Sequence, residues 1–143
     1  MEELNINIVA ILVAVAANFF LGFLWYTPLF GKAWAKELGF DMGTKPPGSV
    51  LAKGMIIMVI GNFFQAYVFA HNIAAWTYVP EADTMSPMMS IVNASVFTWL
   101  GFYLPVDLNR VAWEKASWKL FFINTSYHFL TPVVAAAILT YMR

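Results

Sequence analysis

The sequence predicts an all-α membrane protein in which four helices cross the bilayer as a bundle. Hydrophobic residues make up 61% of the 143 residues and charged residues only 11%, whereas charged residues form about a quarter of a typical soluble domain. Four apolar stretches are long enough, or nearly so, to cross a hydrocarbon core of about 30 Å. The basic residues gather in two of the three connections between these stretches, as they do in multi-pass membrane proteins.

The four predicted spans cover residues 6–26, 52–77, 88–106 and 120–141, and they form one transmembrane domain over residues 1–143. A backbone in lipid must satisfy its own hydrogen bonds, which only helices and closed barrels achieve. The long continuous apolar runs differ from the alternating strands of a barrel. The chain opens with Glu2 and Glu3 instead of the basic segment of a signal peptide, so we expect the first span to be retained.

The distribution of positive charge predicts the orientation of the spans. Only Arg143 lies on the side of the termini, and the second connection carries Glu81 and Asp83 without a basic residue. The positive-inside rule therefore places loops 1 and 3 in the cytoplasm of a bacterial inner membrane and both termini outside. The seven other basic residues lie in or beside loops 1 and 3: Lys32, Lys36, Lys45, Lys53, Arg110, Lys115 and Lys119.

Aromatic and basic residues alternate where the first span ends, in the stretch "LGFLWYTPLFGKAWAKE". Pro28 is expected to end the first helix, because proline lacks the backbone N–H that a helix interior needs. Short helices in the membrane interface are predicted in loops 1 and 3, with aromatic rings at the level of the lipid headgroups. The anchors identified in this way are Trp25, Tyr26, Lys32, Trp34, Trp113 and Trp118.

The same region has a counterpart later in the chain. An offset of 79 residues aligns "LGFLWYTPLFGKAWAK" with "LGFYLPVDLNRVAWEK" and gives seven identities in sixteen positions. One explanation is a tandem parallel repeat of two-helix units, whose halves are related by a pseudo-twofold axis along the membrane normal. The other is that similar helix ends converge on similar Trp and Lys anchors.

Five polar side chains are expected to share a layer inside the spans. By a rise of 1.5 Å per residue, all of them except Gln65 lie roughly 7–15 Å from the helix ends that face loops 1 and 3. Gln65 lies three residues after Asn62, on the same helical face. Such side chains either bond between helices or form a pocket for a headgroup, a quinone or a small solute. No acidic or basic residue is predicted within the middle of a span, and Asp107 is expected at the interface. The layer comprises Asn18, Asn62, Gln65, Asn124 and His128.

Several kinds of chemistry find no support in the sequence. The chain has no cysteine, which excludes thiolate metal sites and cysteine nucleophiles. His71 and His128 lie roughly 28 Å and 12 Å from the same side of the membrane, too far apart in depth to hold one haem. Ser126 lies on a different helical face from His128, so no catalytic triad is indicated. We expect neither enzymatic activity nor a metal, a cofactor or a nucleic-acid partner.

Two segments carry a resemblance to a known family. The first is "LGFLWYTPLFGKAW", which includes Gly22, Pro28 and Gly31, and the second is "FFINTSYHF", residues 121–129. With them the chain resembles the DUF1761 family of small bacterial membrane proteins, although Thr27 stands where that family more often has serine. Because the activity of the family is uncharacterised, the resemblance implies a four-span layout and a membrane location and no chemistry.

The expected function is therefore association rather than catalysis. In a lipid bilayer, 25 aromatic residues (13 Phe, 6 Trp and 6 Tyr) offer large packing surfaces to a homo-oligomer or to a larger membrane complex with this chain as an accessory subunit. The alternative is binding or transport of a small solute, a lipid or a quinone through the polar layer.

Overall fold

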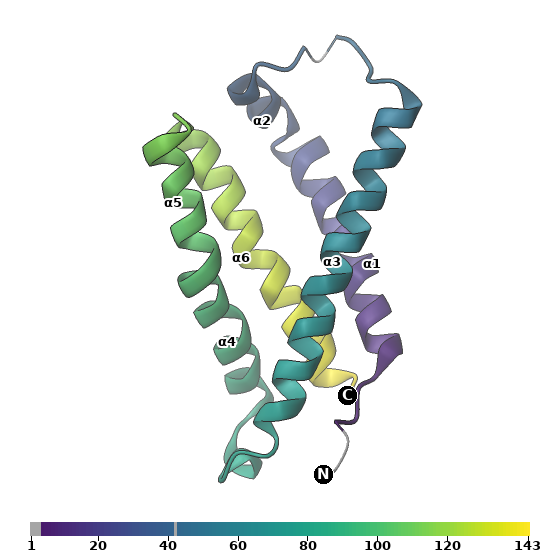
Figure 1. The fold of residues 1–143 in the computed structure, drawn as a ribbon, viewed down its shortest axis with the longest axis vertical. Helices are drawn as coiled ribbons and strands as arrows, with labels where there is room; N and C mark the ends of the chain where they lie inside the picture. Colours follow the sequence, from purple (N-terminus) through teal and green to yellow (C-terminus); the bar gives the residue numbers. More distant parts are fainter. Residues whose placement is uncertain (1–3, 42) are drawn as a thin grey trace.

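The computed structural model describes residues 4–41 and 43–143, and these residues form helices and no strand. The π-helical turn η1 (Trp25–Leu29) follows α1, and a second π-helical turn, η3 (Trp99–Tyr103), joins α4 to α5. A 3₁₀ turn, η2 (Ala82–Thr84), precedes α4. Figure 1 shows the helices as one elongated bundle. The α-helices are α1 (Ile8–Leu24), α2 (Gly31–Leu38), α3 (Gly48–Trp76), α4 (Pro87–Thr98), α5 (Leu104–Trp113) and α6 (Trp118–Tyr141).

Four continuous helical segments are long and apolar enough to cross a membrane. They contain 22, 29, 27 and 24 residues, and at 1.5 Å per residue even the shortest is about 33 Å long. The prediction of an all-α, four-span architecture is thus confirmed, and the chain is a multi-pass membrane protein by the length and composition of its helices. The segments are Ile8–Leu29, Gly48–Trp76, Pro87–Trp113 and Trp118–Tyr141.

The two ends of the bundle differ in charge. Figure 1 shows both termini at one end and the connections α2–α3 and α5–α6 at the other. Seven of the eight basic residues of the chain belong to the end with these two connections, which we call the basic end. The opposite end, with both termini and the α3–α4 connection, is called the terminal end.

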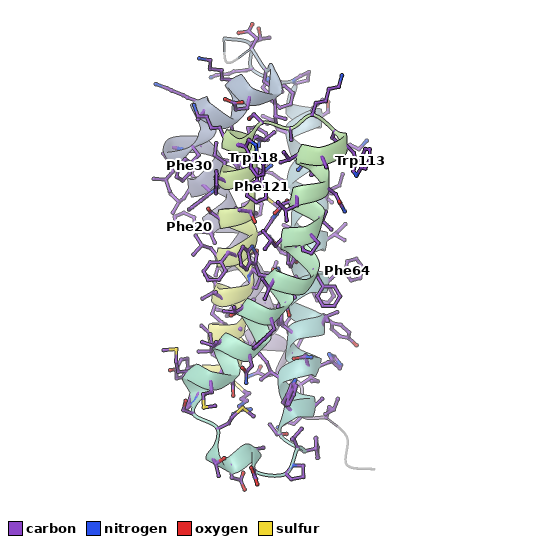
Figure 2. The ribbon with its side chains drawn as sticks, turned by 90° about the vertical axis from the view of Figure 1, so that its left-hand side faces the viewer. Phe20, Phe30, Phe64, Trp113, Trp118 and Phe121 are labelled. Atoms are coloured by element: carbon purple, nitrogen blue, oxygen red, sulfur yellow. The ribbon has the colours of Figure 1, made fainter. Side chains whose placement is uncertain are left out.

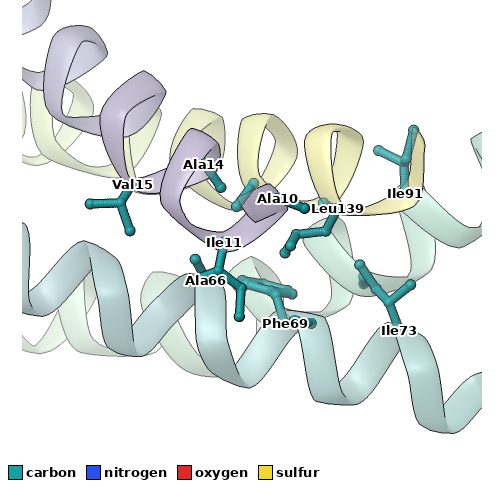
Figure 3. Close-up of a cluster of buried hydrophobic side chains, with 13 residues drawn as sticks. Ala10, Ile11, Ala14, Val15, Ala66, Phe69, Ile73, Ile91 and Leu139 are labelled. Carbon is teal, nitrogen blue, oxygen red and sulfur yellow. The ribbon is translucent and has the colours of Figure 1, made fainter. Parts of the chain in front are cut away.

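Helix α6 is the central helix of the bundle, because it packs against α1, α3, α4 and α5. Near the terminal end it contributes Ala135, Ala136 and Leu139 to a buried apolar cluster with α1, α3 and α4. Figure 3 shows Ile11 of α1 facing Ala66 and Phe69 of α3 within this cluster. Small residues at such contacts let helix backbones approach closely, so van der Waals packing holds this half of the bundle together.

The other half of the bundle is more open. Every residue of α3 from Gly48 to Gly61 is exposed or half-buried, and Figure 1 shows α3 and α5 diverging toward the basic end. Large apolar side chains project outward around the bundle, including Phe20 and Phe64 (Figure 2). In water such a surface would be costly, whereas lipid tails solvate it readily.

Side-chain caps explain where two of the spans begin. The Asn7 side chain accepts hydrogen bonds from the first backbone N–H groups of α1, and Ser117 does the same for α6. These caps satisfy donors that have no partner inside the helix. Helix α3 begins directly after Pro47, four residues earlier than predicted.

The π-helical turns alter how the first and third spans end. Pro28 lies inside η1, and Pro105 occupies the first turn of α5 directly after η3. A widened turn accommodates a proline, whose ring and missing N–H disrupt a regular helix. The first span therefore runs through Pro28 to Leu29, beyond the predicted end at residue 26.

The third span differs most from the prediction. The sequence analysis ended it at residue 106 and expected a separate interfacial helix in loop 3. In the structure this helix is α5, the direct continuation of α4 and η3, and the span reaches Trp113. Pro105 is tolerated because its missing N–H falls in the first turn of α5. Of the two loops, only loop 1 carries a separate short helix, α2.

Candidate functional site

A buried hydrogen-bonded cluster links α1, α3, η3 and α6 in the middle of the bundle. The Asn18 amide donates to Oε1 of Gln65 at 3.0 Å and to the backbone carbonyl of Thr131 at 3.1 Å. The Gln65 amide in turn donates to the Tyr103 hydroxyl at 2.9 Å. Such bonds contribute about 0.6–2 kcal/mol each in membranes, so this cluster stabilises the arrangement of the helices.

A second polar group lies nearer the basic end. The Tyr26 hydroxyl donates to Oδ1 of Asn124 at 3.0 Å and thereby joins η1 to α6. On the α5 side of α6, Nδ1 of His128 lies 2.8 Å from Oδ2 of Asp107. Asn124 and His128 are one turn apart, so α6 presents one polar face to both neighbours.

The Asp107–His128 pair is the most unusual feature of the bundle. Their side chains are 2% and 28% exposed, respectively, and Asp107 lies within the segment Pro87–Trp113 that spans the membrane. A carboxylate only accepts hydrogen bonds, so an ionised Asp107 would pair with an Nδ1–H of the imidazole. Ionisable side chains within membrane spans are costly to bury and commonly mark functional sites.

The contact between Asp107 and α6 was not predicted from the sequence. The third span was expected to end at residue 106, with Asp107 at the interface and no acidic residue in the middle of a span. In the structure α5 continues the helix of the third span, and Asp107 is buried against α6. The spacing of Tyr103, Asp107 and Arg110 at i, i+4 and i+7 was the available signal for one polar helical face.

Two tyrosine rings pack beside the imidazole of His128. The ring centroids of Tyr103 and Tyr127 lie 5.5 Å and 5.9 Å from that of the imidazole. Tyr127 also contacts Tyr26, with ring centroids 5.0 Å apart. Within the residues that the structure describes, Nδ1 pairs with Asp107 and Nε2 of His128 has no hydrogen-bond partner.

The remaining members of the predicted polar layer lie apart from this pair. Asn62 is buried on α3, and its amide nitrogen has no hydrogen-bond partner among the described residues. The structure thus joins Asn18 with Gln65, places Asn124 and His128 on one face of α6, and leaves Asn62 unconnected. His71 lies in the last third of α3, where its Nδ1 donates to the Tyr67 carbonyl at 2.8 Å.

The predicted aromatic anchors fall into two groups. Trp25 is half-buried, and its indole N–H donates to the Ile123 carbonyl of α6 at 2.9 Å. Trp34 packs on the ring of Tyr26, with centroids 5.2 Å apart. Trp113 and Trp118, in contrast, are 84% and 59% exposed at the basic end, where their rings can reach the headgroups.

Trp99 repeats the bond that Trp25 makes. Both residues begin a π-helical turn, and the Trp99 indole donates to the Thr125 carbonyl at 3.1 Å, two residues beyond the acceptor of Trp25. The two turns lie 74 residues apart, from position 25 to position 99. The offset of 79 residues therefore does not align the two turns, although the tryptophan of each turn donates a hydrogen bond to the same stretch of α6.

The other anchors of the first motif also make local contacts. A Cβ atom added to Gly22 would lie 2.9 Å from the Tyr127 hydroxyl, and one added to Gly31 would lie 2.6 Å from the Tyr26 carbonyl oxygen. Glycine at position 22 lets α6 approach α1 closely, and glycine at position 31 lets η1 approach α2 closely. Pro28 and Lys32 are exposed.

Comparison with known families agrees with this architecture. A family model described as "Protein of unknown function (DUF1761)" matches residues 9–140, which is nearly the whole chain. The chain belongs to the DUF1761 family. The two segments that carried the resemblance in this DUF1761 protein meet in space, because Trp25 and Tyr26 of the first bond to Ile123 and Asn124 of the second. No curated protein and no solved structure is significantly similar to the chain.

Proposed function

We propose that this DUF1761 protein binds a small amphipathic molecule inside the membrane at the Asp107–His128 pair. The observation that carries the proposal is the buried carboxylate of Asp107 within a spanning segment, 2.8 Å from His128. Replacing a buried pair of this kind by apolar residues is often neutral or stabilising, so stability alone does not account for its presence. A lipid, a quinone or a small solute fits the apolar surroundings.

The hydrogen bonds around the pair leave one donor and one acceptor open. The Tyr103 oxygen accepts from Gln65, so its own hydroxyl hydrogen remains available. His128 uses Nδ1 for Asp107, which leaves Nε2 as an acceptor while the imidazole is neutral. A hydroxyl or an acid group on a ligand both donates and accepts, and it therefore matches this pair of side chains.

Access to the site is expected from the surrounding lipid. The His128 side chain is 28% exposed, so part of the imidazole is not covered by neighbouring helices. A molecule dissolved in the lipid would reach this part of the ring from the side, without passing through a water-filled channel.

We propose binding without catalysis. Ser126, a possible nucleophile two residues before His128, lines a groove with Trp25 and Trp99 rather than the space around His128. A nucleophile needs a base within hydrogen-bond reach, and the hydrogen bonds of the described residues provide none for Ser126.

The experiment is native mass spectrometry of the protein extracted gently from its own membrane. Wild type and the control variant His71→Gln, at the other histidine, should retain a defined extra mass, whereas Asp107→Asn and His128→Gln should lose it. Circular dichroism verifies that all four proteins are helical. Equal retention by the folded variants, or no extra mass on wild type, would contradict the proposal.

Association as a homo-oligomer or as an accessory subunit is a second candidate. Added Cβ atoms at Gly54 and Gly61 of α3 would meet nothing within 4 Å, and the two residues lie seven positions apart, on one face of the helix. Small residues on an uncovered face allow a second helix to pack closely. The same spectra should then show several chains, and Gly61→Leu should reduce that mass to one chain. A single chain in lipid and in several mild detergents would remove this candidate.

We further propose that the basic end faces the cytoplasm of a bacterial inner membrane, with both termini outside. The concentration of seven basic residues at that end supports this orientation. In this orientation the site lies in the cytoplasmic half of the membrane.

A further inference from the structure

One side of α6 borders an open apolar groove. Two adjoining cavities of about 340 Å³ and 380 Å³ share Ser126 as a lining residue, and together we call them the α6 groove. The first is lined by Trp25, Phe30, Ala33, Lys119, Phe122, Ile123 and Ser126, and the second by Trp99, Thr125, Ser126, Phe129 and Leu130.

The walls of the groove are fixed before any ligand arrives. Trp25 on one side and Trp99 on the other are tied to backbone carbonyls of α6 by their indole N–H groups. The small Ser126 side chain lies where the two cavities meet. Preformed apolar grooves of this kind bind ligands with little cost of reorganisation.

The length of the groove matches one leaflet of a bilayer. Its lining residues on α6 run from Lys119 to Leu130, which corresponds to roughly 16 Å at 1.5 Å per residue. Half of a hydrocarbon core of about 30 Å is similar in depth. An acyl chain lying along α6 would thus fill the groove from the basic end toward the middle of the membrane.

A single positive charge lies at the entrance of the groove. Lys119, in the first turn of α6, is the only ionisable residue among the described residues that line the two cavities. Its amino group is 4.0 Å from Glu37, and the Lys119 side chain is 59% exposed. An ion pair at this distance that involves a largely exposed lysine is weak, so Lys119 remains able to pair with a negatively charged headgroup.

We propose that the α6 groove binds an anionic phospholipid, with one acyl chain between Trp25 and Trp99 and the headgroup phosphate at Lys119. The combination of an apolar groove of one-leaflet length with a cation at its interfacial end is the complement of such a lipid. Basic pockets between helices on one side of a membrane hold anionic headgroups in the same way. This site is separate from the Asp107–His128 pair, so either proposal can fail alone.

The test compares lipid retention by native mass spectrometry after reconstitution with phosphatidylglycerol or phosphatidylcholine. Wild type should retain phosphatidylglycerol in preference. Lys119→Gln should lower this retention about fivefold, whereas Lys45→Gln, at an exposed position in loop 1, should leave it unchanged. Ser126→Phe should block the groove for either lipid, and Ser126→Ala should not.

Two results would overturn the proposal. The first is equal retention of both lipids by wild type and by Lys119→Gln, a variant that changes only an exposed side chain and should fold. The second is a dimer that Ser126→Phe converts to single chains, because a second copy of the protein would then occupy the groove.

Discussion

Nδ1 of His128 on α6 lies 2.8 Å from Oδ2 of Asp107 on α5, across 21 positions of sequence. The pair joins α5 to α6 near the basic end. Asp107 is almost completely shielded, while His128 keeps part of its ring exposed. The two residues should therefore respond differently to loss of the partner.

A double-mutant cycle with leucine measures this interaction. Asp107→Leu should lower the free energy of unfolding by about 2–3 kcal/mol, because it leaves a partly exposed imidazole without its acceptor. His128→Leu should cost more, since the Asp107 carboxylate then stays buried without a donor. The double variant should cost far less than the sum, with a coupling energy of about 3 kcal/mol, because no unpaired polar group is left buried. Additive effects in unfolding from mixed micelles would show that the pair is not formed.

Close packing at Gly31 provides a matched comparison of glycines. Gly31→Ala should destabilise the protein by about 1–3 kcal/mol, because the new Cβ would lie 2.6 Å from the Tyr26 carbonyl oxygen. Gly61→Ala, where an added Cβ meets no atom within 4 Å, should change stability by less than about 0.5 kcal/mol. Thermal unfolding in detergent compares both with wild type. Equal effects of the two substitutions would mean that Gly31 of α2 does not lie against the Tyr26 carbonyl of η1.

The proposed orientation is open to a labelling test, because the chain contains no cysteine. A cysteine introduced in loop 1, Thr44→Cys, should react with a membrane-impermeant maleimide only after the cells are permeabilised. A cysteine between α3 and α4, Asp83→Cys, should react in intact cells. The reverse labelling pattern would show the opposite topology, with the Asp107–His128 pair in the outer half of the membrane.

Loop 1 contains a turn that should depend on pH. The backbone N–H of Gly43 and the hydroxyl of Thr44 both donate to Asp41 and hold the pKa of its carboxyl below the usual range. Because the folded-state pKa is lowered, the turn should be fully favoured above the ordinary carboxyl pKa, and this contribution should be lost as the pH falls through the lowered value. Thr44→Ala should raise the pKa measured by carbon NMR. An unchanged pKa would show that the hydroxyl is not a donor.

The sequence predicted the spans well because hydropathy and length depend only on local composition. It also placed Asn18, Gln65, Asn124 and His128 inside the membrane, since a helix has a fixed rise per residue. Their partners were not predictable in this way. Whether Gln65 meets Tyr103 depends on how each helix is rotated about its axis, and packing between helices sets that rotation.

The extent of the third span shows a different limit. Pro105 suggested the end of a helix, but the π-helical turn Trp99–Tyr103 lets the chain continue to Trp113. A π-helical turn lacks a simple sequence pattern, so the predicted helix was too short. The burial of Asp107 against α6 was missed for this reason.

Nitrogen NMR of histidine-labelled protein in bilayers is the most direct test of the Asp107–His128 pair, because the chain has only two histidines. We predict that Nδ1 of His128 is protonated and hydrogen-bonded, that its signal shifts strongly in Asp107→Asn, and that the His71 signals do not shift. An Nδ1 of His128 that is unprotonated, or whose signal is indifferent to Asp107→Asn, would contradict the Asp107–His128 pair and the binding site built on it.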